Sequence, residues 1–331
     1  MDFTYNTFYI IEQQIPFGKS YTFILSVLVM STSQGGNPAI ERLNQRMSRL
    51  TTMEGRQKVL GFVPRSSDVI VATPMKCGTT WMQQIMHQLR SGGDMTFTDI
   101  DEVVPWIELA YDVGLDLDAE HKYQPRCFKT HASYDVCPKG GKYILVYREP
   151  CASFYSAFNF FTGIHFQPEE VTLDEFVKNM ISPNKKIRAN YFQHLLSWWP
   201  KRNDPNVLFL LYEDMLDDLG SAVRAVASFM GIDDEASITN AVKMSTFDFM
   251  KQSRDKFASN LVSSHRNKAL GISEGVRLHR VATGSATKGR EIMDEWTKQA
   301  AQEMWNEIVT KETGFQDYSD FREALKREKQ S

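Results

Sequence analysis

Residues 73–81 combine residue types that bind phosphate groups. Lys76 lies two residues before Gly78, and the hydroxyl side chains of Thr79 and Thr80 follow at the start of an expected helix. Backbone N–H groups and the positive end of the helix dipole attract an anion at such a position, and the lysine adds a full positive charge. Threonines at the start of a helix also serve simply as caps, so two interpretations of this segment are open.

The order of these residues differs from that of the common nucleoside-triphosphate loop. In that loop, Gly-x-x-x-x-Gly-Lys-(Ser/Thr), the lysine follows the second glycine, and the next hydroxyl binds the magnesium ion of the nucleotide. Here Lys76 precedes Gly78 instead. The segment therefore predicts a site for a phosphate-type anion, and it gives no indication of a bound metal ion.

Two further positions combine a cation with a second polar side chain. Lys129 is followed two residues later by His131, whose ordinary pKa of about 6.5 suits a general base at neutral pH. Arg148 offers a fork of N–H donors for a phosphate, and Ser156 follows about two helical turns later. Taken alone, His131 is more often an ordinary structural histidine, and Arg148 could instead form a surface pair with Glu149.

Four short apolar segments are predicted to be the strands that position these residues. They span residues 69–72, 126–130, 143–147 and 207–212. Helical periodicity is present at residues 39–53, 79–89, 151–161, 173–180, 187–199 and 221–230. This order predicts a single α/β domain with a central parallel sheet covered by helices on both faces. Ligands of such sheets bind at the carboxyl ends of the strands, where Lys76, His131, Arg148 and Tyr212 are all expected.

These segments resemble the motifs of the sulfotransferases that use PAPS (3′-phosphoadenosine 5′-phosphosulfate), in particular the cytosolic type. The resemblance extends from about residue 60 to 325. The phosphosulfate loop of that family reads close to Tyr-Pro-Lys-Ser-Gly-Thr-Thr-Trp, and from Lys76 to Trp81 this chain differs from it only at Cys77. The other motifs have counterparts in Lys129-Thr130-His131, Arg148-Glu149-Pro150 with Ser156, Tyr212-Glu213-Asp214-Met215, and Ser245-Thr246-Phe247 with Met250.

The resemblance implies a sulfotransferase fold with a P-loop-like phosphosulfate-binding loop. It implies an enzyme that moves a sulfuryl group from PAPS to a hydroxyl or amine of a small acceptor and leaves the nucleotide PAP, without a metal ion. His131 would be the catalytic base, with Lys76 and Lys129 assisting at the transferring group. The residues implied to bind the donor are Lys76, Cys77, Gly78, Thr79, Thr80, Trp81, Arg148, Ser156, Tyr212, Ser245, Phe247, Met250, Arg280 and Gly284.

Several features depart from the family pattern. Met75 takes the place of the usual loop proline, and the late signature Arg-Lys-Gly-x-x-Gly has only a loose counterpart at residues 284–290. Either Arg277 or Arg280 is therefore a candidate for the 3′-phosphate. The dimerisation segment of the family is not evident, so the oligomeric state stays open. Two rival hypotheses are a nucleotide or nucleoside kinase with a degenerate loop and an inactive relative that binds PAP.

The acceptor is the least determined part of the prediction. Trp106, Phe161 and His165 fall in segments implied to line the acceptor side, although an ordinary core position is at least as good an interpretation of them. An aromatic pocket would favour phenols, steroids or similar alcohols, whereas an acid-lined pocket would favour a cationic acceptor such as an amine. The candidate acids are Glu102, Glu108 and Asp112. The sequence leaves both options open.

The composition of this chain of 331 residues limits the classes of partner. A net charge of −3 gives no overall basic field for nucleic acid or an anionic membrane surface, and the apolar run at residues 21–30 is too short to span a bilayer. The four cysteines lack metal-like spacing and are expected to stay reduced in the cytoplasm. We expect a poorly ordered extension over residues 1–38, the sulfotransferase domain over 39–325 and a tail over 326–331.

Overall fold

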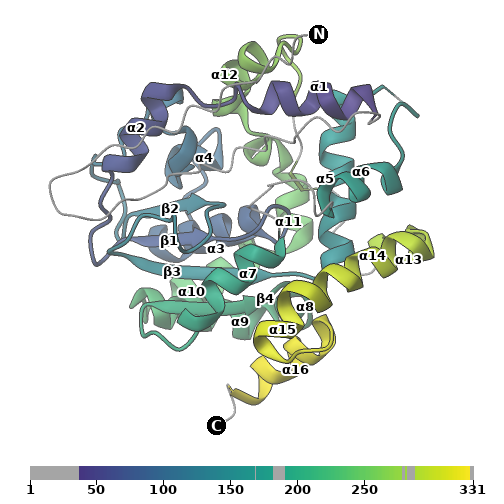
Figure 1. Cartoon of the computed structure of the whole chain (residues 1–331). Coiled ribbons are helices and arrows are strands. Elements are labelled where there is room, and N and C mark those ends of the chain that lie inside the picture. The colour runs from purple at the N-terminus through teal and green to yellow at the C-terminus, as the bar shows by residue number, and fades with distance from the viewer. Residues whose placement is uncertain (1–36, 168, 182–190, 278–279, 282–287, 329–331) are drawn as a thin grey trace, which may run out of the picture.

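Four parallel strands form the central sheet of the residues that the computed structural model describes, which are 37–167, 169–181, 191–277, 280–281 and 288–328 (Figure 1). The strands are β1 (Val69–Ala72), β2 (Cys127–Thr130), β3 (Lys142–Tyr147) and β4 (Val207–Leu211), in the order β2-β1-β3-β4. In the register of the sheet Val69 pairs with both Cys127 and Lys142. The carboxyl ends of the strands therefore meet at one edge of the sheet.

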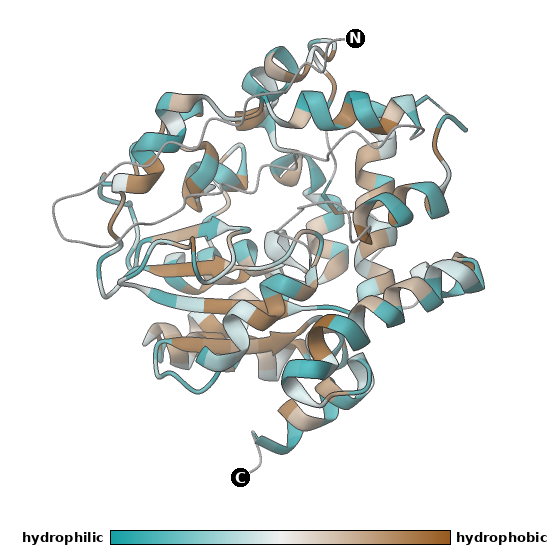
Figure 2. Cartoon of the chain, viewed as in Figure 1, coloured by the Kyte–Doolittle hydropathy of each residue, from teal (hydrophilic) through white to brown (hydrophobic). Residues whose placement is uncertain are grey.

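Helices cover both faces of the sheet. Alternate strand residues such as Val71 and Val146 pack against α3 (Thr79–Ser91), α9 (Leu219–Met230) and α10 (Glu235–Met244). The residues between them, such as Ile70 and Tyr147, pack against α5 (Pro150–His165) and α7 (Tyr191–Trp198). Burial on both faces accounts for the lack of polar and apolar alternation in the strands, and Figure 2 shows them as the brown centre of the molecule. The predicted α/β fold is confirmed.

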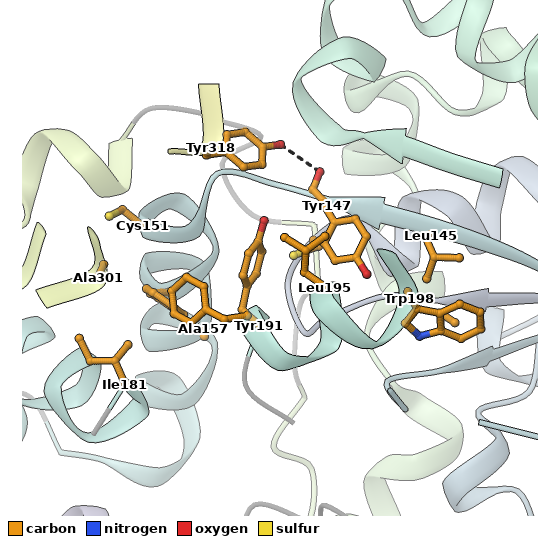
Figure 3. Close-up of a cluster of buried hydrophobic side chains, with 14 of the residues drawn as sticks. Leu145, Tyr147, Cys151, Ala157, Ile181, Tyr191, Leu195, Trp198, Ala301 and Tyr318 are labelled. Carbon is orange, nitrogen blue, oxygen red and sulfur yellow. Dashed lines mark hydrogen bonds between the residues drawn. The ribbon is translucent and has the colours of Figure 1, made fainter. Parts of the chain in front are cut away.

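The C-terminal helices extend the core beyond one end of the sheet. Tyr318, at the start of α16 (Tyr318–Glu328), donates a hydrogen bond of 3.3 Å to the carbonyl oxygen of Tyr147, the last residue of β3 (Figure 3). Trp198 and Leu195 of α7 lie beneath β3 in the same cluster. The predicted tail at 326–331 overlaps this helix, because α16 continues to Glu328.

The remaining elements surround this frame. The other α-helices are α1 (Pro38–Met47), α2 (Met53–Gly61), α4 (Ile100–Val103), α6 (Leu173–Ile181), α8 (Tyr212–Asp217), α11 (Phe247–Gln252), α12 (Asn260–Leu270), α13 (Lys288–Ile292), α14 (Glu295–Trp305) and α15 (Lys311–Thr313). Short 3₁₀ turns are η1 (Ile107–Leu109), η2 (Tyr111–Val113), η3 (Trp199–Lys201) and η4 (Arg254–Phe257), and η5 (Asn306–Thr310) is a π turn. None of the described helices is long and apolar enough to cross a bilayer. The four cysteines are free and buried.

The prediction of one helix over residues 39–53 is wrong. α1 ends at Met47, and α2 begins at Met53 after a turn. The side chain of Thr52 caps α2 by accepting a hydrogen bond of 2.9 Å from the N–H of Gly55, and its own backbone N–H donates to Asp112 Oδ2 at 3.1 Å. A cap residue that is held by a distant carboxylate therefore prevails over the helical periodicity of the segment.

Two predicted strands are one residue too long. Arg126 precedes β2, and its side chain forms a buried ion pair with Asp68, with Nη2 2.5 Å from Oδ2. Tyr212 begins α8 rather than ending β4. The helix expected over residues 187–199 is observed as α7 from Tyr191 to Trp198, and residues 187–190 lie outside the described part of the chain.

Candidate active site

A cavity of about 230 Å³ lies at the carboxyl ends of the strands. Residues at or just after the ends of β1, β2 and β3 line it, together with residues of α8, α11 and α12. The predicted site residues among its walls are Lys76, Gly78, Thr79, Thr80, Trp81, Trp106, Lys129, His131, Arg148, Ser156, Phe161, His165, Tyr212, Phe247, Met250 and Arg280. The fold therefore gathers most of the predicted donor-side and acceptor-side residues around one space.

The loop between β1 and α3 forms one wall and is held in a tight conformation. Lys76 and Gly78 have φ angles of 65° and 105°, a region that favours glycine. A Cβ at Gly78 would lie 3.0 Å from a ring carbon of Tyr212, so a larger residue would press against that ring. The hydroxyl of Thr79 is hydrogen-bonded to that of Thr73 across the loop.

The start of α3 has no side-chain cap. Gly78 is its N-cap residue, so the interpretation of the two threonines as mere caps is wrong. Thr79 and Thr80 instead line the cavity. The uncapped N–H groups and the helix dipole at this end are suited to bind a phosphate-type anion.

Cys77, another predicted donor-binding residue, does not line the cavity. Cys77 is fully buried under the loop, where its Sγ lies 3.6 Å from Ser153 Oγ, and burial raises the pKa of the Cys77 thiol to about 12. The thiol therefore packs as part of the core. Gly284 lies outside the described residues.

Lys76, Lys129, Arg148 and Arg280 are four of the five Lys and Arg side chains that line the cavity among the described residues. Asp101 binds two of them, since its carboxylate lies 2.6 Å from Lys129 Nζ and 2.5 Å from Arg280 Nη2. Burial, followed by the charges of Arg280, Arg148 and Lys129, lowers the pKa of Lys76 to about 7. Burial and Arg280 likewise lower the pKa of Lys129 to about 8. This crowding of positive charge would be relieved by a bound polyanion.

Asp101 was missed by the sequence reasoning. Although burial opposes ionisation, Arg280 and Lys129 hold the pKa of Asp101 well below its ordinary value. Asp101 is one of three acids in residues 99–102, and nothing in that short run distinguishes it. The structure also separates the two candidate arginines, because Arg280 lines the cavity whereas Arg277 is exposed.

His131 is held in one tautomer. Its Nδ1 lies 2.9 Å from the carbonyl oxygen of Thr73. Because a carbonyl can only accept, Nδ1 carries the proton and Nε2 keeps its lone pair. Burial, with the charges of Lys129, Arg280 and Lys76, lowers the pKa of His131 to about 4. The imidazole is therefore neutral at pH 7 and can accept a proton from a bound hydroxyl.

Glu108 supports the backbone next to His131. Its Oε1 accepts hydrogen bonds from Thr130 Oγ1 at 2.6 Å and from the N–H of His131 at 3.1 Å. Burial raises the pKa of Glu108. The other two candidate acids also have partners elsewhere, Glu102 at Thr98 and Asp112 at Thr52. Among the described residues, none of these three acids lines the cavity, so the acid-lined acceptor pocket is not observed.

Aromatic rings frame the side of the cavity around Arg148. The guanidinium carbon of Arg148 lies 4.4 Å from the centre of the Tyr212 ring, and its Nη1 donates to the carbonyl oxygen of Lys76 at 3.2 Å. Tyr212 also makes an edge contact with Trp81, at 5.4 Å between ring centres. Trp81 is in turn held by a hydrogen bond of 2.6 Å from Nε1 to the carbonyl oxygen of Ser245. Ser245 is thus buried behind Trp81.

Another part of the cavity wall is apolar. Leu50, Leu109, Val262 and Leu270 form one buried cluster, with Trp106 packed against it, and all five line the cavity. Phe161 and His165 of α5 lie at the cavity with their rings 5.8 Å apart. The cavity therefore combines a cationic, partly aromatic region with a mainly apolar one.

The comparison with protein families matches this chain to one family. Residues 66–309 match the family described as the sulfotransferase domain. The chain is 31% identical over 244 residues to the amine sulfotransferase of Oryctolagus cuniculus, which covers 71% of this chain and 79% of the relative. It is 29% identical over 287 residues to the luciferin sulfotransferase of Photinus pyralis, which covers 75% of each.

Solved structures share the fold at lower sequence identity. Retinol dehydratase in complex with androsterone and inactive cofactor PAP superposes with a TM-score of 0.60 at 20% identity, covering 80% of this chain and 85% of that one. A mouse sulfotransferase complexed with PAP also gives a TM-score of 0.60 at 20% identity, with coverage of 78% and 90%.

Proposed function

We propose, since the chain belongs to the sulfotransferase family, that it transfers a sulfuryl group from PAPS to a hydroxyl or amine of a small-molecule acceptor and releases PAP. The observation that carries this proposal is His131, a neutral imidazole with a free Nε2 lone pair, placed in the same cavity as a crowded group of cations. A base for the acceptor and a binding surface for an anionic donor are the two things that this reaction needs.

The residues present fit such a donor. The uncapped start of α3 and the half-buried Lys76 would hold the 5′ phosphosulfate. Arg148, Ser156 and Arg280 would hold the 3′-phosphate, and Trp81 and Tyr212 would frame the adenosine. When bound, PAPS supplies a sulfuryl group on a phosphate that leaves as a stabilised anion.

The chain's own residues would then act as follows. His131 Nε2 takes the proton of the acceptor hydroxyl while the acceptor oxygen bonds to sulfur. The bond from sulfur to the bridging phosphate oxygen breaks, and its electron pair stays on that oxygen. Lys76 and the N–H groups of the loop stabilise this charge as it forms. Glu108 and the carbonyl of Thr73 keep His131 in place and in the required tautomer.

A thermal-shift experiment and a transfer assay test the proposal together. PAP at a hundred times its dissociation constant should stabilise the protein by about 2.7 kcal/mol. AMP and ATP at the same concentration should stabilise it much less. Labelled sulfate from PAPS should appear on at least one member of a panel of phenols, alcohols and amines. Equal stabilisation by ATP, together with no labelled product in the whole panel, would contradict the proposed function.

The affinity for PAP should fall as pH rises above about 7. An anion binds best when Lys76 and Lys129, whose pKa values are lowered to about 7 and about 8, are both protonated. Well below pH 7 both lysines carry their charge, so they add no pH dependence there. Above these pKa values binding must take up protons, and the affinity should fall by up to about tenfold per pH unit for each lysine.

Calorimetry in buffers of different ionisation enthalpy measures this proton uptake directly. The Lys76→Arg variant keeps its charge throughout the range, so it should take up fewer protons and lose part of the slope. Binding of PAP that is independent of pH between about 7 and 9, without proton uptake, would refute this coupling between PAP binding and protonation of the two lysines.

A further inference from the structure

Arg266 occupies an unusual position in the apolar part of the cavity wall. It lies on α12 between Val262 and Leu270, at the spacing of four residues that puts all three side chains on one face of the helix. All three are buried and line the cavity. A guanidinium group therefore interrupts an otherwise hydrophobic stripe.

The guanidinium is fixed in place on one side only. Its Nε and Nη2 donate to Asn267 Oδ1 at 3.0 and 2.8 Å, and Nη2 also donates to the carbonyl oxygen of Val276 at 2.7 Å. Its Nη1 is buried and has no hydrogen-bond partner among the described residues. Arg266 itself is only 6% exposed. The fork is therefore oriented in advance, and one of its nitrogens has no hydrogen-bond partner among the described residues.

No described carboxylate neutralises this charge. Arg266 forms no salt bridge within the described part of the chain, whereas Asp101 is already shared by Lys129 and Arg280. Burial and the charge of Arg280 lower the pKa of Arg266 only to about 10, so it stays charged at pH 7. Burying a cation without a counter-ion is unfavourable, and a ligand anion would offset that cost.

His165 lies close enough to Arg266 to be affected by its charge. Burial, Arg46 and Arg266 lower the pKa of His165 to about 4, and His165 Nδ1 is likewise buried without a described partner. Both side chains line the cavity. His165 is therefore neutral at pH 7, and the positive charge of Arg266 at this cavity is the opposite of what a cationic amine would require.

We infer that the acceptor carries a carboxylate in addition to its reacting hydroxyl, and that Arg266 Nη1 binds this carboxylate. The acceptor class is a hydroxylated, largely apolar carboxylic acid, because Leu50, Val262 and Leu270 line the same cavity as Arg266 and make this part of its wall apolar. This inference rests on the proposed function and specifies its acceptor. An arginine in a dry site discriminates strongly, because the wrong ligand leaves its donor unpaired.

Matched acceptors test the inference on the wild-type protein. The probes are 4-hydroxyphenylacetate, 3-(4-hydroxyphenyl)propanoate and 4-(4-hydroxyphenyl)butanoate, each paired with its neutral amide, and tyramine as the cation. We expect kcat/KM for the best acid to exceed that of its amide by at least about tenfold, the scale of one charged hydrogen bond. We expect tyramine to be poorer still. The pair 3-phenylpropanoate and 3-phenylpropanamide has no hydroxyl to accept the sulfuryl group. In the presence of PAP, the acid should inhibit the transfer reaction more strongly than the amide.

Variants then assign the preference to Arg266. In Arg266→Met the ratio of acid to amide should fall to about one, and Arg266→Lys should recover part of it. Arg224→Met is the matched control, because Arg224 is an exposed arginine that pairs with Glu235 on the surface, and its ratio should equal that of the wild type. If Arg266→Met does not fold, the inhibitor pair on the wild-type protein still decides the question.

The outcomes separate this inference from the proposed function. Transfer from PAPS that favours the amides or tyramine would overturn the carboxylate inference alone, and so would an unchanged ratio in a folded Arg266→Met variant. Absence of transfer to every probe, with no stabilisation by PAP, would remove the proposed function and the inference together.

Discussion

The His131→Ala variant is expected to lose at least about a hundredfold in kcat, the scale at which a general base contributes. In the wild-type protein the bond from Nδ1 to the Thr73 carbonyl directs the lone pair of Nε2 away from the loop. Alanine removes this imidazole, so water must take the proton. Binding of PAP should persist, because the cations that line the cavity are unchanged. Single-turnover transfer of labelled sulfate, with calorimetry of PAP, measures both.

His121→Ala is a suitable control for that experiment. Burial also lowers the pKa of His121 to about 4, yet its Nδ1 accepts from Arg90 at 3.1 Å, and it does not line the cavity. Its loss should lower stability but leave turnover per folded molecule nearly unchanged. Near-normal turnover of His131→Ala would refute the assignment of His131 as the base.

The sequence predicted the sheet and its helices well because the strands are apolar on both faces. Burial by helices on both sides leaves this pattern in the sequence, and β1 was predicted with its observed bounds. The break between α1 and α2 was not predictable in this way. It depends on Thr52 meeting Asp112, which lies 60 residues away along the chain.

In the candidate site, too, local sequence patterns predicted some features, whereas others depend on residues far away in the chain. The loop at Gly78 and the Lys129-Thr130-His131 segment are local patterns, and the fold brings both to one cavity. Asp101 escaped prediction because its role comes from Arg280, 179 residues away. Arg266 escaped because an arginine at one turn of a helix has no local feature that marks it as buried. Residues whose role depends on a distant partner are the ones that local pattern cannot identify.

The remaining large effect is expected for Lys76→Ala, with a loss of about a hundredfold to a thousandfold in kcat. This is the cost of removing one preorganised donor from the developing charge of a transition state. Lys76 extends over the ring of Phe160, with Nζ 4.1 Å from its centre. Burial, followed by the charges of Arg280, Arg148 and Lys129, already lowers its pKa to about 7. Its free amine is therefore strongly favoured to regain a proton beside an anion.

Whether Lys76→Ala changes kcat or the KM for PAPS distinguishes two possible roles of Lys76. If it acted only by attracting the donor, Lys76→Ala would raise the KM for PAPS and leave kcat unchanged, which would contradict a role at the leaving phosphate. A loss in kcat at saturating PAPS supports that role. Lys58→Ala is the matched control, because Lys58 also lies over an aromatic ring, that of Tyr111, but on the exposed surface. Since its charge is screened by water, both kinetic constants of that variant should stay at wild-type values.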